Sequence, residues 1–282
     1  MAKITSAPSG DLKLRVLSAL VLAPVVLGAV WQGGIYFQIL IGLVIILSAW
    51  EWARVTCAET WFVDGLLIAG TALFALQLAI MPGAMGDLER LFYIAGAIIS
   101  GMALAGSLAS MRGQQLRWRL LGVPYIAMGP AALVWLRGQE ETGLILTLWL
   151  LLLVWAMDSG AYFAGRSIGG PRLAPHISPN KTWAGLIGGM LSAGIAGAFI
   201  GWVEPVVTEP LPVLLMAVMS ALIGAWSQAG DIAESCVKRR FGVKDMGNLI
   251  PGHGGVLDRI DGLLFAAPAM AAGVLVLNSI GT

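Results

Sequence analysis

Residues 143–163, GLILTLWLLLLVWAMDSGAYF, form an apolar run that contains one charged residue, Asp158. A helix needs about 20 mostly apolar residues to cross the hydrocarbon core of a bilayer. The run therefore predicts a transmembrane helix. A carboxylate near the end of such a helix is costly unless it lines an aqueous cavity, so Asp158 is also a candidate functional residue.

The whole chain shares this apolar character. Of its 282 residues, 58% are hydrophobic and only 12% are charged, about half the charged share of a soluble domain. The net charge of +1 gives no overall field typical of a nucleic-acid binder, so we expect no nucleic-acid partner. Cys57 and Cys236 are too few and too isolated for a disulfide framework or a zinc site. These features predict an integral membrane protein.

Eight further apolar stretches resemble the first one, so we expect an all-α, polytopic protein with about nine transmembrane helices. The first run in the chain follows Lys13 and Arg15, as the apolar part of a signal peptide follows basic residues, but it is long and lacks a convincing small-residue cleavage site. The nine expected helices lie at roughly 14–31, 35–52, 62–82, 91–110, 119–136, 143–163, 183–203, 211–230 and 262–280.

The basic residues predict the orientation of the chain. If successive helices alternate in direction, 15 of the 17 Lys and Arg residues fall on one side, and only Arg90 and Arg137 fall on the other. The positive-inside rule then places the N-terminus in the cytoplasm and the C-terminus outside, in the inner cell membrane. We give Arg112, Arg117 and Arg119 no role beyond topology and contact with anionic headgroups.

Acidic residues on the cytoplasmic side are not explained by topology. Asp231, Glu234, Ser235 and Lys238 have the spacing of one helix face, and their Cα atoms would span about 10 Å. A carboxylate end could hold a metal and the lysine end a phosphate. An ordinary salt-bridge ladder at a helix terminus explains the same spacing equally well.

A second acidic pair favours a site. Asp258 and Asp261 begin the last apolar stretch, after the segment PGHGG at residues 251–255. Magnesium prefers one or two carboxylates together with water and phosphate oxygens, and Asp231 and Asp258 could supply them. The glycines would allow backbone N–H groups to approach an anion closely. His253 could be a general base, a phosphate donor or a loop residue, of which we favour the phosphate donor.

Residues 158–185 form another polar segment on the same predicted side. Ser178 and Lys181 stand just before an expected helix start, which is a natural place for an anion to bind. Simple helix capping by Ser178 or Thr182 is the alternative explanation.

The spacing S-x-x-K-R-x4-K-D from Ser235, followed by H-G-G-x-x-D-R-x-D from His253, resembles the signature of the phosphatidate cytidylyltransferases, or CDP-diacylglycerol synthases. The segment DSGAYFAGR, followed by SPNKTWAGLIGG, is similar to the family's other polar segment. The resemblance covers most of residues 140–282. Ala184 departs from it, because many members carry an acidic or amide residue after KTW, and we give this position no role.

The resemblance implies that the protein condenses CTP with phosphatidate, giving CDP-diacylglycerol and pyrophosphate, with Mg²⁺ as cofactor and room for a second or monovalent cation. Residues 1–137 would be N-terminal transmembrane helices, and 138–282 a catalytic region with cytoplasmic polar segments at 158–185 and 231–261. We expect Asp231, Asp258 and Asp261 to bind the metal and, with Lys238, to be catalytic. The expected substrate-binding residues are Asp158, Ser178, Lys181, Ser235, Arg239, Lys244, His253, Gly254, Gly255 and Arg259.

Other functions explain the sequence less well. A CDP-alcohol phosphotransferase would carry D-G-x-x-A-R, but DGLLFAAP, starting at Asp261, lacks the Ala-Arg pair. A polyprenol kinase is another membrane transferase of this kind. A secondary transporter would place charges near mid-bilayer and repeat its hydropathy pattern. The 37 glycines suit close helix packing and would permit a homodimer without requiring one.

Overall fold

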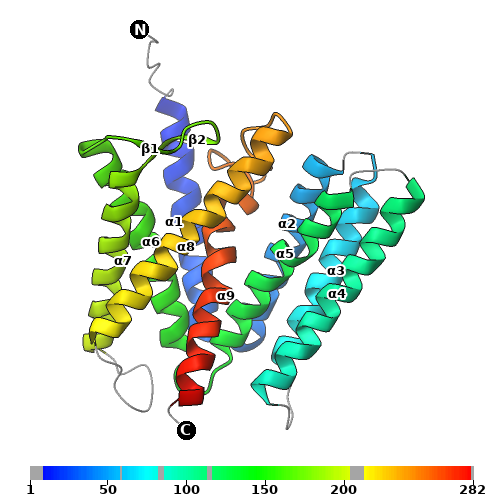
Figure 1. The fold of residues 1–282 in the computed structure, drawn as a ribbon, viewed down its shortest axis with the longest axis horizontal. Helices are drawn as coiled ribbons and strands as arrows, with labels where there is room; N and C mark the ends of the chain where they lie inside the picture. Colours follow the sequence, from blue (N-terminus) through cyan, green and yellow to red (C-terminus); the bar gives the residue numbers. More distant parts are fainter. Residues whose placement is uncertain (1–8, 58, 82–85, 113–115, 204–212, 281–282) are drawn as a thin grey trace.

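A computed structural model describes residues 9–57, 59–81, 86–112, 116–203 and 213–280. These residues form nine helices and one small hairpin (Figure 1). In chain order the elements are α1 (Ser9–Gln32), α2 (Gly34–Thr56), α3 (Trp61–Ile80), α4 (Asp87–Arg112), α5 (Leu116–Arg137), α6 (Gly143–Ser167), β1 (Arg172–Ala174), β2 (Ser178–Thr182), α7 (Trp183–Val203), α8 (Val213–Arg240) and α9 (Leu257–Ile280).

The helices confirm the prediction of a polytopic, all-α membrane protein. Eight of them, α2 to α9, are long and apolar enough to cross a membrane, whereas the apolar part of α1 found within the described residues is the shorter stretch Leu20–Gln32. The outer surface is apolar, and Trp202, Leu214 and Ile195 are each more than 70% exposed. Such an apolar surface, on helices long enough to span a bilayer, is typical of one that faces lipid.

Successive helices run in opposite directions, so every second connection lies at the same end of the bundle. The two polar connections described below share one end. Figure 1 shows the β1–β2 hairpin and the α8–α9 connection at the end where α1 begins, while α9 finishes at the opposite end. Arg90, near the start of α4, and Arg137, at the end of α5, lie at that opposite end. The arrangement agrees with the predicted alternation of the helices.

Helix α8 is longer than its apolar stretch and crosses the bundle obliquely (Figure 1). The expected transmembrane segment ended at residue 230, but the helix continues to Arg240. Its contact with α9 is close, because a Cβ placed at Gly230 would stand 2.5 Å from the carbonyl oxygen of Asp261. Glycine at this position therefore lets the polar end of α8 lie directly against the start of α9.

Arg119 does not lie among lipid headgroups as we expected. Its side chain is 2% exposed and forms an ion pair of 3.0 Å with Asp64, near the start of α3. It also donates a hydrogen bond to Thr60. A buried guanidinium needs such a partner to offset the loss of hydration, so Arg119 joins α5 to α3.

The two predicted regions share one packed bundle. The boundary after residue 137 falls in the turn between α5 and α6, and α9 packs against both α5 and α2. The division into a supporting and a catalytic region stays a prediction.

Candidate functional site

The first of two polar cavities lies between α6, the hairpin and α8. Its volume is about 370 Å³, and its lining includes Asp158, Ser178, Lys181, Gln228 and Asp231. Lys181 Nζ lies 2.7 Å from Asp231 Oδ2, and Gln228 Nε2 donates to Asp158 Oδ1 over 2.9 Å. Three of the predicted charged residues are thus brought together here.

The β1–β2 hairpin positions Lys181 over this cavity. Its strands are antiparallel, with Arg172 paired to Thr182 and Ala174 paired to Ser178. The Thr182 hydroxyl accepts a hydrogen bond from the N–H of Gly185, in the first turn of α7, over 3.0 Å. The capping explanation therefore holds for Thr182, while Lys181 is ion-paired.

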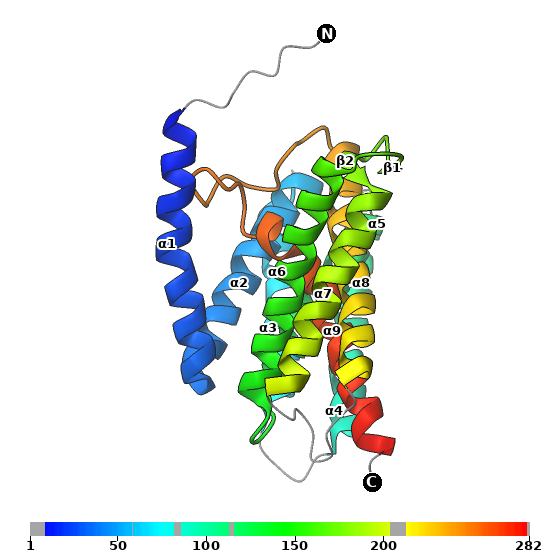
Figure 2. The ribbon, with the colours of Figure 1, turned by 90° about the vertical axis from the view of Figure 1, so that its left-hand side faces the viewer.

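The second polar cavity is formed by the connection between α8 and α9. Its volume is about 670 Å³, and the predicted substrate-binding residues in its lining are Lys244, His253, Gly254 and Arg259. Ser18 of α1 shares a hydrogen bond of 2.7 Å with His253 Nδ1. The Arg259 guanidinium donates to the carbonyl of His253. Figure 2 shows this connection reaching towards α1.

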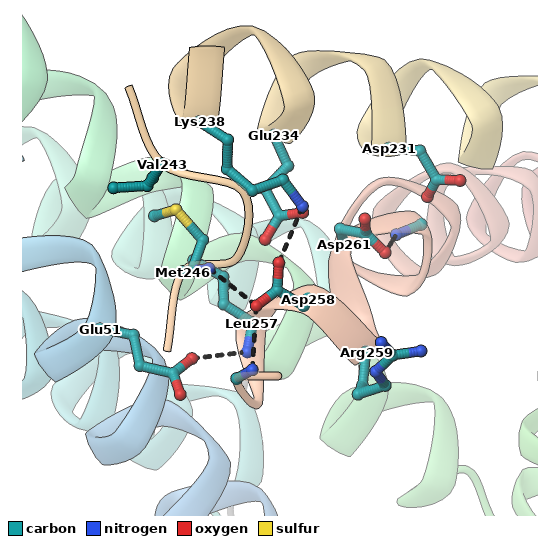
Figure 3. Close-up of polar contacts among 12 residues, drawn as sticks. Glu51, Asp231, Glu234, Lys238, Val243, Met246, Leu257, Asp258, Arg259 and Asp261 are labelled. Carbon is teal, nitrogen blue, oxygen red and sulfur yellow. Dashed lines mark hydrogen bonds and ion pairs between the residues drawn. The ribbon is translucent and has the colours of Figure 1, made fainter. Parts of the chain in front are cut away.

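A buried ion-pair core links the facing ends of α8 and α9. Lys238 pairs with Glu234 and lies 2.8 Å from Asp258 Oδ1. Asp258 Oδ2 accepts hydrogen bonds from the N–H groups of Met246 and Gly255, at 2.8 and 2.9 Å (Figure 3). The salt-bridge explanation is correct for Lys238 and Glu234, and this structure commits both oxygens of Asp258 to protein donors.

The backbone amides around the glycine segment also bind protein carboxylates. Gly255 donates to Asp258, and the next two amides, of Val256 and Leu257, donate to the carboxylate of Glu51 at 3.0 and 2.9 Å. Of these three, only Gly255 belongs to the predicted anion-binding segment 251–255, and its N–H is bonded to Asp258 in this structure. Phosphate binding by the rest of that segment stays a prediction.

The carboxylates of Asp231 and Asp261 extend from α8 and α9 into the space between the two helices (Figure 3). Asp261 also accepts a hydrogen bond from the N–H of Gly262. Within the described residues, no group of three His, Cys, Asp or Glu side chains is placed to hold a metal, so Asp231, Asp258 and Asp261 do not form a ready three-ligand site. Two carboxylates nevertheless suit Mg²⁺, which takes its other ligands from water and phosphate.

Two further predicted residues lie near the end of α8. Arg239 is exposed and donates to the carbonyls of Ile177 and Val243, each over 3.3 Å. Ser235 is half-buried on α8, next to Glu234. A substrate-binding role for Arg239 and Ser235 stays a prediction.

Glu51 and Gln228 were not predicted as site residues. Gln228 gave no signal, because a single amide in an apolar helix is unremarkable. Glu51 did give one, since it is a carboxylate within the spanning helix α2, and such groups are functional candidates. Its partners lie more than 200 residues away, and no spacing rule connects them.

The fold and the two cavities define a polytopic membrane protein whose polar site, built from Lys, Arg and carboxylate side chains, lies at one end of the helical bundle. Residues 13–277 match the model of the cytidylyltransferase family, and the chain belongs to that family.

Curated relatives extend over nearly the whole chain. A phosphatidate cytidylyltransferase of Brucella suis is 39% identical, with 91% of each chain covered. One of Pseudomonas aeruginosa is also 39% identical, over 93% of this chain and 96% of its own. One of Bacillus subtilis is 29% identical, over 92% and 96%.

Proposed function

We propose that this protein is a phosphatidate cytidylyltransferase, which condenses CTP with phosphatidate to give CDP-diacylglycerol and pyrophosphate. Membership of the family and the names of the relatives support the assignment. The structural observation that carries it is the pair of cavities at the same end of the bundle, one with Lys181 and one with Lys244 and Arg259. A reaction between two phosphate-bearing substrates requires cationic groups for each.

The chemistry needs positioning and charge stabilisation more than a strong base. An oxygen of the phosphatidate monoester, already anionic at neutral pH, forms a bond to the α-phosphorus of CTP. The bond from that phosphorus to the oxygen bridging the β-phosphorus breaks, and pyrophosphate leaves with the electron pair. Lys181, Lys244 and Arg259 would bind the phosphates and oppose their mutual repulsion.

Asp231 and Asp261 would hold Mg²⁺, which supplies neutralisation of phosphate charge when bound. The donor set supports this proposal, because both groups are hard oxygen ligands and come from the adjacent helices α8 and α9. Asp258 would instead hold Lys238 in place. A role for Asp258 as a metal ligand requires it to exchange its present partners for the metal.

The reaction would occur at the cytoplasmic face of the inner membrane, where CTP is available. The gathering of basic residues at the cavity end supports this orientation. Acyl chains of the lipid substrate would stay beside the apolar outer surface.

Incubation of the purified protein with α-labelled CTP, phosphatidate and Mg²⁺ tests the proposal. We expect the label to enter the lipid phase only when all three are present. γ-Labelled CTP should leave its label in the aqueous pyrophosphate. Folded protein that transfers no α-label to phosphatidate would refute the assignment.

A further inference from the structure

The carboxylate of Glu51 ties the N-terminal half of the bundle to the start of α9. Glu51 belongs to α2 and is 7% exposed. Its two oxygens accept hydrogen bonds from the N–H groups of Val256 and Leu257, which occupy the N-terminal end of α9. These amides have no partner within their own helix, and a carboxylate interacts favourably with the positive end of a helix dipole.

The surrounding backbone is shaped for this carboxylate. A Cβ at Gly255 would lie 2.5 Å from Glu51 Oε2, and one at Gly247 would overlap Oε1. Glycine at both positions lets the α8–α9 connection close around Glu51 from two sides. Any larger residue at either position would displace the carboxylate. The contact therefore requires the space left by the two glycines as well as the negative charge of Glu51.

The same short segment holds the groups on which the reaction depends. Gly255 precedes the two amides bound by Glu51 and donates to Asp258, which in turn pairs with Lys238. Asp261 lies one turn further along α9. The connection also carries Lys244 and His253 into the second cavity. A shift at the start of α9 would therefore move Asp258 and Asp261 as well as the cavity residues Lys244 and His253.

We propose that Glu51 is a positioning residue for cytidylyl transfer: by holding the first amides of α9, it fixes the α8–α9 connection and keeps the α9 carboxylates opposite α8. The role of Glu51 in cytidylyl transfer rests on the proposed function. The contact between Glu51 and the start of α9 does not. It gives the N-terminal helices a task beyond membrane insertion, since α2 supplies the anchor.

Replacement Glu51→Gln tests the inference with almost no change in volume. The amide oxygen of Gln can accept from one N–H, while its NH₂ group would face the other. We expect exchange of the Val256 and Leu257 amides with deuterium to quicken at least about tenfold, because their protection depends on local opening. Turnover should fall about 10- to 100-fold, as is typical when a supporting contact of a site is lost.

Matched variants separate positioning from general stability. Glu140→Gln makes the same change at an exposed residue at the other end of the bundle, and should keep wild-type exchange and turnover. Glu51→Asp retains the charge and should recover part of the turnover. The melting temperature of the Glu51→Gln variant should equal that of the Glu140→Gln control within experimental error, while its kcat falls.

Gly247→Ala displaces the Glu51 carboxylate and leaves residue 51 unchanged. It provides the test if the Glu51→Gln variant does not fold. It should reproduce the faster exchange and lower turnover, and the double variant should be no worse than the more severe single variant. Unchanged exchange at 256–257, or faster exchange with wild-type turnover, would overturn the inference. If the wild-type protein transfers no cytidylyl group, the proposed function fails, while faster exchange in Glu51→Gln still supports the anchor.

Discussion

Lys238 joins the buried ion-pair core, since its one ammonium group pairs with two carboxylates. Its side chain is 12% exposed, that of Asp258 is 4% exposed, and that of Glu234 is fully buried. Lys238→Met should lower the free energy of unfolding by about 3 kcal/mol, because it leaves buried carboxylates without a counter-charge. Thermal melting in detergent measures the loss.

A double variant tests whether Lys238 and Asp258 act as a pair. Asp258→Asn in the Lys238→Met background should cost less than the sum of the two single changes, since the partner charge is already absent. Lys244→Met is the stability control, because Lys244 is exposed and its replacement should change unfolding by less than about 0.5 kcal/mol. Additive losses would show that the pair is not coupled.

The acidic residues should divide into two classes by their response to magnesium. Asp231→Asn and Asp261→Asn remove charge from the proposed metal site and should lower turnover at least about 100-fold while raising the Mg²⁺ concentration needed for half-maximal activity. Asp258→Asn should lower the melting temperature and turnover but leave that concentration unchanged. An equal shift in the Mg²⁺ requirement for Asp258→Asn would instead make Asp258 a ligand, as the sequence alone suggested.

The sequence predicted the chemistry of the site residues better than their contacts. Spacing along one helix correctly joined Glu234 to Lys238, because that relation follows from helical geometry. The bonds of Lys181 to Asp231 and of Glu51 to α9 connect different elements. They depend on how the helices cross, which the local pattern does not determine.

At the scale of elements, the crossing of α8 and α9 controls the distance between their carboxylates. Gly230→Ala would press a methyl group against the Asp261 carbonyl and Phe265. We expect a loss of about 1–3 kcal/mol in stability, as for other overpacked contacts, together with reduced transfer. Melting and turnover should both be measured.

Gly96→Ala in α4 provides the control for this change. A Cβ there meets nothing within 4 Å, and alanine is the better helix former, so stability should be equal or higher. If Gly230→Ala behaves like Gly96→Ala, the close crossing does not position the site.

The helices themselves were predictable because length and apolar composition are decisive in a membrane. The expected segment 183–203 coincides with α7, and the others differ by a few residues at most ends. The polar end of α8 lay beyond the expected membrane span, although the spacing of Asp231, Glu234, Ser235 and Lys238 already indicated a continuing helix. The β1–β2 hairpin was not predicted as an element, since a Pro-containing loop gives no clear periodic signal.

For the whole molecule, the orientation in the membrane is testable with single cysteines. In a Cys236→Ser background, which removes the exposed native thiol, Ile177→Cys and Asn248→Cys should react with impermeant reagents only from the cytoplasmic side. Glu140→Cys should react only from outside. Labelling of position 248 in intact cells would reverse the orientation and separate the site from CTP.

The slant of α8 also has a consequence for the surrounding lipid. Within the described residues its apolar part precedes Asp231, and the tilt of the helix shortens the distance along the bilayer normal that this part spans. The nearby leaflet should therefore thin, which lowers the headgroup plane towards Asp231 at a cost of fractions of a kcal/mol per Å. We expect transfer in proteoliposomes to slow as the acyl chains of the host lipid lengthen, at constant headgroup composition and substrate fraction. A transfer rate that does not depend on bilayer thickness would show that local thinning of the membrane does not bring lipid headgroups to the site.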